Sequence, residues 1–106
     1  MKKFLETATP LGASGTYTGV TRPVNDTPDK VEVFAEFLAD QASANNGAQL
    51  QGSDDGTNWF VIAQGTLTAS VPLALSAVLL YANYRVVLTN GGTAQTSLQV
   101  KSGVTG

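Results

Sequence analysis

The chain has 106 residues, the usual size of one domain and too short for two independent cores. Charged residues make up only 13% of it, about half of the ~25% typical of folded domains, so Thr, Ser, Asn, Gln and Gly must dominate its surface. Six basic and eight acidic residues are scattered along the sequence, and no cluster of them could follow a phosphate backbone, which argues against nucleic acid as a partner.

The apolar segments are too short for a secretory signal or a membrane span. Phe4 and Leu5 follow two lysines, but Glu6 interrupts them, whereas a signal peptide needs ~7–15 apolar residues. The longest apolar segment, residues 71–82, contains Pro72 and falls short of the ~20 residues that cross a bilayer. We therefore expect synthesis in the cytoplasm and no membrane partner.

Residues 1–29 are interpreted as an extended N-terminal arm, because prolines and glycines interrupt them and no helical period occurs. Only residues 15–19 have the composition of a short strand. An arm of this kind cannot bury its apolar side chains alone, so we expect it to lie on a neighbouring subunit. The candidate partner-binding residues of the arm are Phe4, Leu5, Pro10, Leu11 and Tyr17.

Residues 30–106 are predicted to form one β-sandwich domain. Residues 30–39 alternate strictly, with Val31, Val33, Ala35 and Phe37 on the core face. Residues 40–47 are rich in Ala, Ser and Asn and are predicted to be a loop, and residues 48–64 a hairpin that turns at residues 54–58.

The second half of the chain contains one ambiguous segment and one clear pattern. Residues 65–82 fit two short strands joined near Pro72, with a helical turn at residues 73–80 as the alternative. Residues 84–89 and 95–101 alternate around an Asn90-Gly91-Gly92-Thr93 turn and are predicted to form a hairpin. About seven short antiparallel strands at this spacing predict an all-β fold, a small β-sandwich.

Alternation also predicts the core residues. Trp59 and residues 54–58 each allow two interpretations. Trp59 is either a core anchor or a platform on which a sugar ring stacks. The Asp54–Asn58 segment resembles a calcium loop only weakly, because the alternating acidic spacing and terminal Glu of such loops are missing, and an Asx-type turn explains it better. The predicted core residues are Val33, Phe37, Leu50, Trp59, Val61, Tyr84, Val86, Leu88, Leu98 and Val100.

The inventory of reactive side chains argues against catalysis. The sequence contains no His and no Cys, so the commonest general base, metal ligand and nucleophile are all missing. Glu32 and Glu36 share one face of the predicted strand, but they lie ~13 Å apart at 3.3 Å per residue, too far for a glycosidase pair. We expect no enzyme activity, no catalytic residues, no metal and no cofactor.

The edges of so small a sandwich predict self-association. Charged residues normally protect edge strands, but residues 48–82 contain only Asp54 and Asp55, both in the predicted turn. A partner chain would cover such an edge, so we expect a dimer or a trimer. The candidate oligomer contacts are Val71, Leu73, Leu75, Val78 and Leu80.

Four pieces of the sequence, taken in order, resemble a module that recurs in the virion proteins of tailed phages. They are residues 9–19, Ala39-Asp40-Gln41, the turn from Ser53 to Trp59, and Tyr84-Arg85-Val86 with Asn90-Gly91 and Ala94-Gln95-Thr96-Ser97. The resemblance implies a non-enzymatic structural protein on the surface of the phage particle. Its partners would then be the major capsid protein or other virion proteins.

The sequence is compatible with two functions. The first is a capsid cement or decoration protein that binds and stabilises the lattice of the major capsid protein. The alternative is a carbohydrate- or receptor-binding module of a phage tail, spike or fibre, because sandwich folds carry many binding functions.

Overall fold

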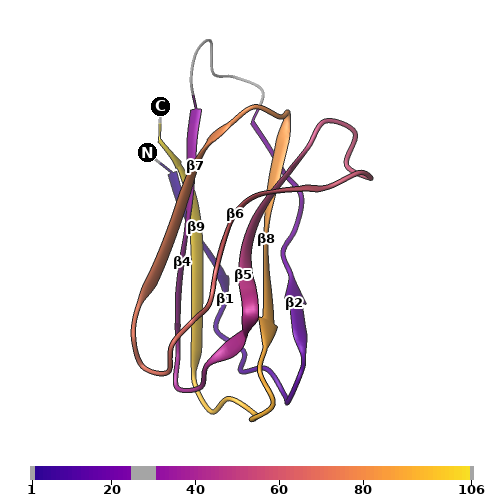
Figure 1. Ribbon diagram of the computed structural model, residues 1–106. Helices are drawn as coiled ribbons and strands as arrows, with labels where there is room; N and C mark the ends of the chain where they lie inside the picture. Colours follow the sequence, from indigo (N-terminus) through magenta and orange to yellow (C-terminus); the bar gives the residue numbers. More distant parts are fainter. Residues whose placement is uncertain (1, 25–30, 106) are drawn as a thin grey trace.

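The computed structural model describes residues 2–24 and 31–105, which form an all-β sandwich, as predicted. Two antiparallel sheets pack face to face (Figure 1), and within the described residues no helix is present. The strands are β1 (Lys2–Thr7), β2 (Thr16–Thr18), β3 (Arg22–Pro23), β4 (Val31–Ala39), β5 (Ser43–Ser53), β6 (Phe60–Gly65), β7 (Leu73–Leu79), β8 (Asn83–Asn90) and β9 (Leu98–Thr105).

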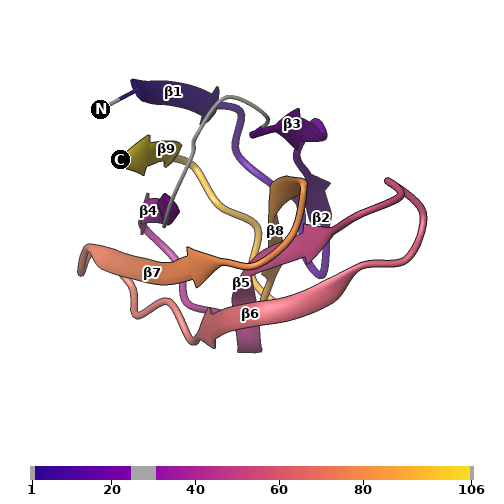
Figure 2. The same cartoon turned by 90° about the horizontal axis from the view of Figure 1, so that it is seen from above.

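The strands divide between the sheets in a way that leaves two open sides. The first sheet has the order β1-β9-β4-β7, and the second has the order β2-β8-β5-β6, with β3 also paired to β8. Seen from above (Figure 2), β7 lies beside β6 on one side of the sandwich, and β1 lies toward β3 on the other. Each side therefore brings together the edge strands of both sheets.

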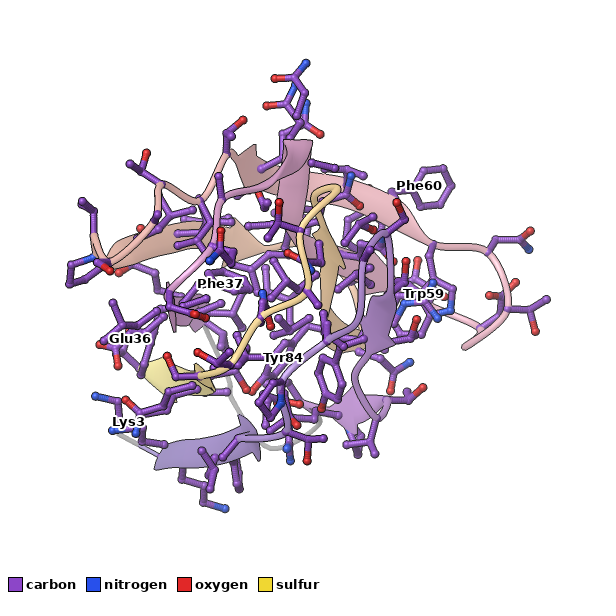
Figure 3. All side chains as sticks on the ribbon, turned by 90° about the horizontal axis from the view of Figure 1, so that it is seen from below. Lys3, Glu36, Phe37, Trp59, Phe60 and Tyr84 are labelled. Carbon is purple, nitrogen blue, oxygen red and sulfur yellow. The ribbon has the colours of Figure 1, made fainter. Side chains whose placement is uncertain are left out.

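The alternation of β4 is confirmed by burial. Val31, Val33, Ala35 and Phe37 are buried between the sheets, while Glu32 is exposed. Figure 3 shows Phe37 and Tyr84 pointing into the space between the two layers. Eight of the predicted core residues are buried: Val33, Phe37, Leu50, Tyr84, Val86, Leu88, Leu98 and Val100.

Two predicted core residues lie elsewhere. Val61 is 48% exposed and Trp59 is only half-buried, so both predictions were wrong. A bulge in β6 explains Val61: Ala63 pairs with Leu50, but Val61 already pairs with Gln51, so the alternation breaks at the intervening residue. Sequence patterning also missed Leu67, which is fully buried although it lies in the connection between β6 and β7.

Several predicted boundaries also change. Most of the predicted 40–47 loop belongs to β5, which begins at Ser43 and is irregular up to Ala48. Apart from Gly65, which ends β6, residues 65–82 contain one strand, β7, in place of two strands or a helical turn. Residues 48–64 do form the predicted hairpin.

The predicted hairpin of residues 84–101 is wrong. β8 belongs to the second sheet and β9 to the first, so the turn after Asn90 carries the chain across the sandwich. Asp40 holds this crossing connection: its Oδ1 atom accepts hydrogen bonds from the backbone N–H groups of Thr96 and Ser97, and its Oδ2 atom accepts one from the Thr96 hydroxyl. Alternation describes which face a residue occupies, and it does not say which sheet the strand joins.

The N-terminal segment is part of the sandwich in the region that the structure describes, in contrast to the predicted arm. β1 pairs with β9, and β2 and β3 pair in succession along β8. The short strand expected at residues 15–19 is present as β2. Pro23 is tolerated because β3 lies at a sheet edge. Pro28 and the predicted boundary at residues 29–30 lie outside the described residues.

None of the residues from 2 to 24 and from 31 to 105 belongs to a helix long and apolar enough to cross a membrane.

Candidate binding surface

The outer face of the second sheet is almost free of charge. The pairing of β8 with β2 and β5, and of β5 with β6, places nine side chains there, and Arg85 is the one charged residue among them. The nine are Thr16, Thr18, Gln49, Gln51, Val61, Gln64, Arg85, Val87 and Thr89. We call this set face B.

Arg85 is held in one position on face B. Its Nε atom donates a hydrogen bond to Oε1 of Gln51 at 2.7 Å, and Nε2 of Gln51 donates to Oε1 of Gln49 at 2.8 Å. The guanidinium carbon lies 4.2 Å from the centre of the Trp59 ring, so the cation covers one face of the indole. Burial lowers the pKa of Arg85 from its usual value.

The turn before Trp59 is an Asx-type turn, as the sequence predicted. The Oδ1 atom of Asp55 accepts hydrogen bonds from the Ser53 hydroxyl and from the backbone N–H groups of Thr57 and Asn58, and Oδ2 accepts one from the Asn58 amide. These bonds, the Asn58 N–H first among them, hold the pKa of Asp55 well below its usual range. Across the described ranges no group of three acidic or other metal-binding side chains occurs.

An aromatic pair lies beside this turn, where β6 begins. The rings of Phe60 and Tyr81 are stacked, with their centroids 5.6 Å apart. Tyr81 packs so closely on Gly52 that a Cβ atom at that position would lie 2.4 Å from the ring. Phe60 is 54% exposed and points away from the body of the sandwich (Figure 3).

The outer face of the first sheet has the opposite character. Lys3, Lys101, Glu32 and Glu36 all point outward from β1, β9 and β4. Lys3 and Glu36 form an ion pair at 2.9 Å, and Figure 3 shows them together outside the sheet. A shallow cavity of about 310 Å³ lies beside them, between Leu38, Pro72 and Gln99. The outer face of the first sheet thus carries four charged side chains, whereas face B carries one.

A buried polar cluster closes the side of the sandwich where β1 meets β2 and β3. The Glu6 side chain is 1% exposed and forms an ion pair with Nε of Arg22 at 2.6 Å. It also accepts hydrogen bonds from the hydroxyls of Tyr17 and Ser102, and the Ser102 hydroxyl is within 3.2 Å of the Tyr84 hydroxyl. Burial, followed by the bond to Glu6, raises the pKa of Tyr17 to about 12. This cluster joins the two sheets.

The five candidate arm residues are therefore engaged within the fold to different degrees. Phe4 lies under the Arg22 guanidinium at 4.2 Å, Leu11 packs against the core, and Tyr17 binds Glu6. Leu5 and Pro10 are exposed. The structure therefore does not bring the five together into one partner-binding surface.

The five candidate oligomer contacts lie in or beside β7 and divide into partly buried and exposed residues. Leu73 and Leu75 point inward and pack against the core. Val71, Val78 and Leu80 are 51%, 47% and 82% exposed, respectively. Only these three are free for contact with another molecule.

Sequence reasoning missed the combination of Trp59 and Arg85. The alternation of residues 84–89 already indicates that Arg85 points outward, because its neighbours Tyr84 and Val86 are core residues. The stacking of Trp59 on it depends on the path of the turn after β5, which no local pattern describes. The weak resemblance of residues 54–58 to a calcium loop was the sequence feature that pointed to this part of the surface, next to Trp59.

Comparison with known proteins begins with structures. A crystal structure titled PBSX exported protein XepA shares the fold, with a TM-score of 0.86 and 20% identity over 97% of this chain. The chain spans only 36% of the length of that protein. The crystal structure of PirA is similar with a TM-score of 0.60 and 13% identity, covering 90% of this chain and 89% of that one.

Comparison by sequence gives the assignment. No curated protein matches the chain. One protein family does, and its match runs from residue 1 to residue 105, across all nine strands. The chain therefore belongs to the family described as the N-terminal domain of the uncharacterised protein YqxG.

Proposed function

We propose that the protein is a non-enzymatic, phage-associated structural protein, and specifically a cement protein that binds the major capsid protein lattice on the particle surface. The sequence resemblance to phage virion modules supports this role, and so does the shared fold with a protein of phage PBSX. The absence of His and Cys from the sequence supports a binding function over a catalytic one.

The two outer faces of the sandwich differ in charge, and this difference supports the proposal. The centres of protein interfaces are depleted in Lys, Asp and Glu and enriched in aromatic residues and Arg. Face B with Trp59 has this composition, whereas the first sheet presents two lysines and two glutamates to solvent. We infer that face B lies against the capsid and the charged face points to water.

Sedimentation with purified phage particles tests this function. The wild-type protein should sediment with the particles at a fixed copy number relative to the major capsid protein. Val61→Asp places a charge on face B and should abolish binding, while the control Lys101→Glu changes the opposite face and should leave it intact. Failure of the wild-type protein to bind particles, or equal loss in both variants, would contradict the proposal.

A receptor- or carbohydrate-binding role is the second candidate, and the half-buried state of Trp59 favours it. An indole in the core could not contact a sugar, but this one reaches the surface beside the exposed Asp54–Asn58 turn. Trp59→Ala should then abolish binding to host cell-wall polysaccharide in an affinity-gel assay. Unchanged migration of the wild-type protein in such gels would remove this candidate.

We further propose that the protein assembles as a dimer or trimer through the side where β6 and β7 lie together. Residues 56–84, which include both strands, contain no charged residue, and Phe60, Val78 and Leu80 are exposed there. Light scattering at micromolar concentration tests this assembly. Leu80→Asp should shift the mass toward the monomer, and a wild-type monomer would contradict the proposal.

A further inference from the structure

We propose that Arg85 is a recognition residue for a carboxylate, which an Asp or Glu side chain of the partner protein presents to face B. This inference rests on the proposed function, because it specifies the chemistry of the surface that docks there. It assigns a role to one residue and predicts a feature of the partner: an otherwise uncharged protein surface with an acidic residue at its centre.

The guanidinium of Arg85 is fixed in position by two neighbours. Gln51 binds Nε and the Trp59 ring supports the plane of the group, so both its direction and its tilt are determined. Gln51 is itself held by Gln49. Nε is the one guanidinium nitrogen with a side-chain hydrogen bond to the described part of the chain, so the two terminal nitrogens are free to donate to a ligand. A planar fork of N–H donors fits a carboxylate in two parallel bonds.

Arg85 has no counter-charge within the part of the chain that the structure describes. Arg22 and Lys3 each form an ion pair with a glutamate, but among residues 2–24 and 31–105 no carboxylate lies within ion-pair distance of Arg85. Partial burial makes an unpaired charge costly, and complete burial under a docked partner would make it more so. A partner that covers face B must therefore supply an anion at this point, or binding would fail.

Face B suits a protein partner better than an acidic polysaccharide. Sugar rings bind proteins by stacking on an open aromatic face, and the guanidinium occupies one face of Trp59. The remaining side chains of face B are Thr, Gln and Val, which suit the flat and uncharged centre of a protein interface. These features favour a side-chain carboxylate over a uronic acid.

Trp59 allows a direct test, because it is the only tryptophan in the chain and lies against Arg85. The protein is titrated with poly-L-glutamate and, separately, with polygalacturonate at equal carboxylate concentration, and tryptophan fluorescence is followed. Poly-L-glutamate should change the emission in a saturable way. Arg85→Gln should weaken this binding by about tenfold or more, since a hydrogen-bonded charge is lost. The affinity of Arg85→Lys for poly-L-glutamate should lie between those of the wild type and Arg85→Gln, because Lys keeps the charge but loses the planar fork of N–H donors.

The control is Lys101→Gln, which removes a cation from the opposite face and should bind poly-L-glutamate like the wild type. Equal binding by the wild type and Arg85→Gln, or no response to poly-L-glutamate, would overturn the inference. Tighter, Arg85-dependent binding of polygalacturonate would overturn it in favour of an acidic sugar. Particle binding that survives in Arg85→Gln would remove the role of Arg85 while leaving the cement function in place.

Discussion

Nε of Arg22 and Oε2 of Glu6 lie 2.6 Å apart, and this ion pair joins β3 of one sheet to β1 of the other. The carboxylate is buried and also accepts hydrogen bonds from Tyr17 and Ser102, so its negative charge is compensated on several sides. The N-terminal segment is therefore tied to the sandwich by more than the pairing of its short strands.

Glu6→Gln should destabilise the protein by about 3–5 kcal/mol, because it leaves the Arg22 cation without its buried counter-charge. The matched control is Glu36→Gln, which removes the exposed ion pair with Lys3 and should cost under about 1 kcal/mol. Urea denaturation of both variants measures the difference. Equal midpoints would show that the Glu6 cluster does not stabilise the fold.

Alkaline pH should destabilise the protein through Tyr17. Its pKa rises from 10.0 to about 12 in the folded state, so the folded protein keeps a proton that the unfolded chain loses. The stabilisation is complete below pH 10 and is lost as the pH rises toward 12. Tyr17→Phe should flatten this part of the stability profile, which thermal unfolding in a pH series would measure. A wild-type melting temperature that does not change across this range would contradict the assignment.

Acid pH should act through Asp40. The Thr96 hydroxyl, together with the backbone N–H groups of Ser97 and Thr96, lowers the pKa of Asp40 from 3.8 to about 2. The stabilisation is present above the unfolded pKa and is lost as the pH falls through the folded value. The melting temperature of Asp40→Asn should therefore fall less than that of the wild type between about pH 5 and pH 2. The control is Glu32→Gln, because the Glu32 side chain accepts no hydrogen bond from the described residues. The melting temperature of this variant should fall with pH as that of the wild type does.

Two apolar residues test the register of the sheets. Leu98→Ala should cost about 2–4 kcal/mol because Leu98 is buried, while Val61→Ala should cost less than about 1 kcal/mol because Val61 is exposed. Guanidinium denaturation separates these outcomes. A larger loss for Val61→Ala would show that the bulge in β6 is misplaced.

The strand pattern of β4 could be predicted from the sequence because its two faces meet different environments, core on one side and water on the other. The same reasoning identified eight core residues, including Val86 and Leu98. It failed at Val61, because a bulge depends on how two strands pair and leaves no mark in the alternation. The Asp54–Asn58 turn was predictable because Asx chemistry is local.

The pairing of the N-terminal strands and the composition of each outer face could not be predicted in the same way. β2 and β3 contain three and two residues, too few for a period to appear, and they pair with residues of β8 that lie 60 to 73 positions away. The stacking of Arg85 on Trp59 likewise joins two positions that are distant in sequence. Composition predicted an uncharged surface, but only the sheet register shows that the two outer faces differ, with four charged side chains on the first sheet and one on face B.

The pairing of β1 with β9 determines how the molecule would respond to force. Lys2 lies opposite Val104, so both chain ends leave from the same end of two neighbouring antiparallel strands (Figure 1). A pull on Lys2 and Val104 would break the hydrogen bonds between β1 and β9 one pair at a time, because those bonds lie perpendicular to the strands. Shear along the strands would instead load all of them together. Such a pull would separate β1 from β9 as far as Glu6, where the buried ion pair with Arg22 resists it. Forces on the molecule are therefore better borne by contacts on the broad faces of the sheets.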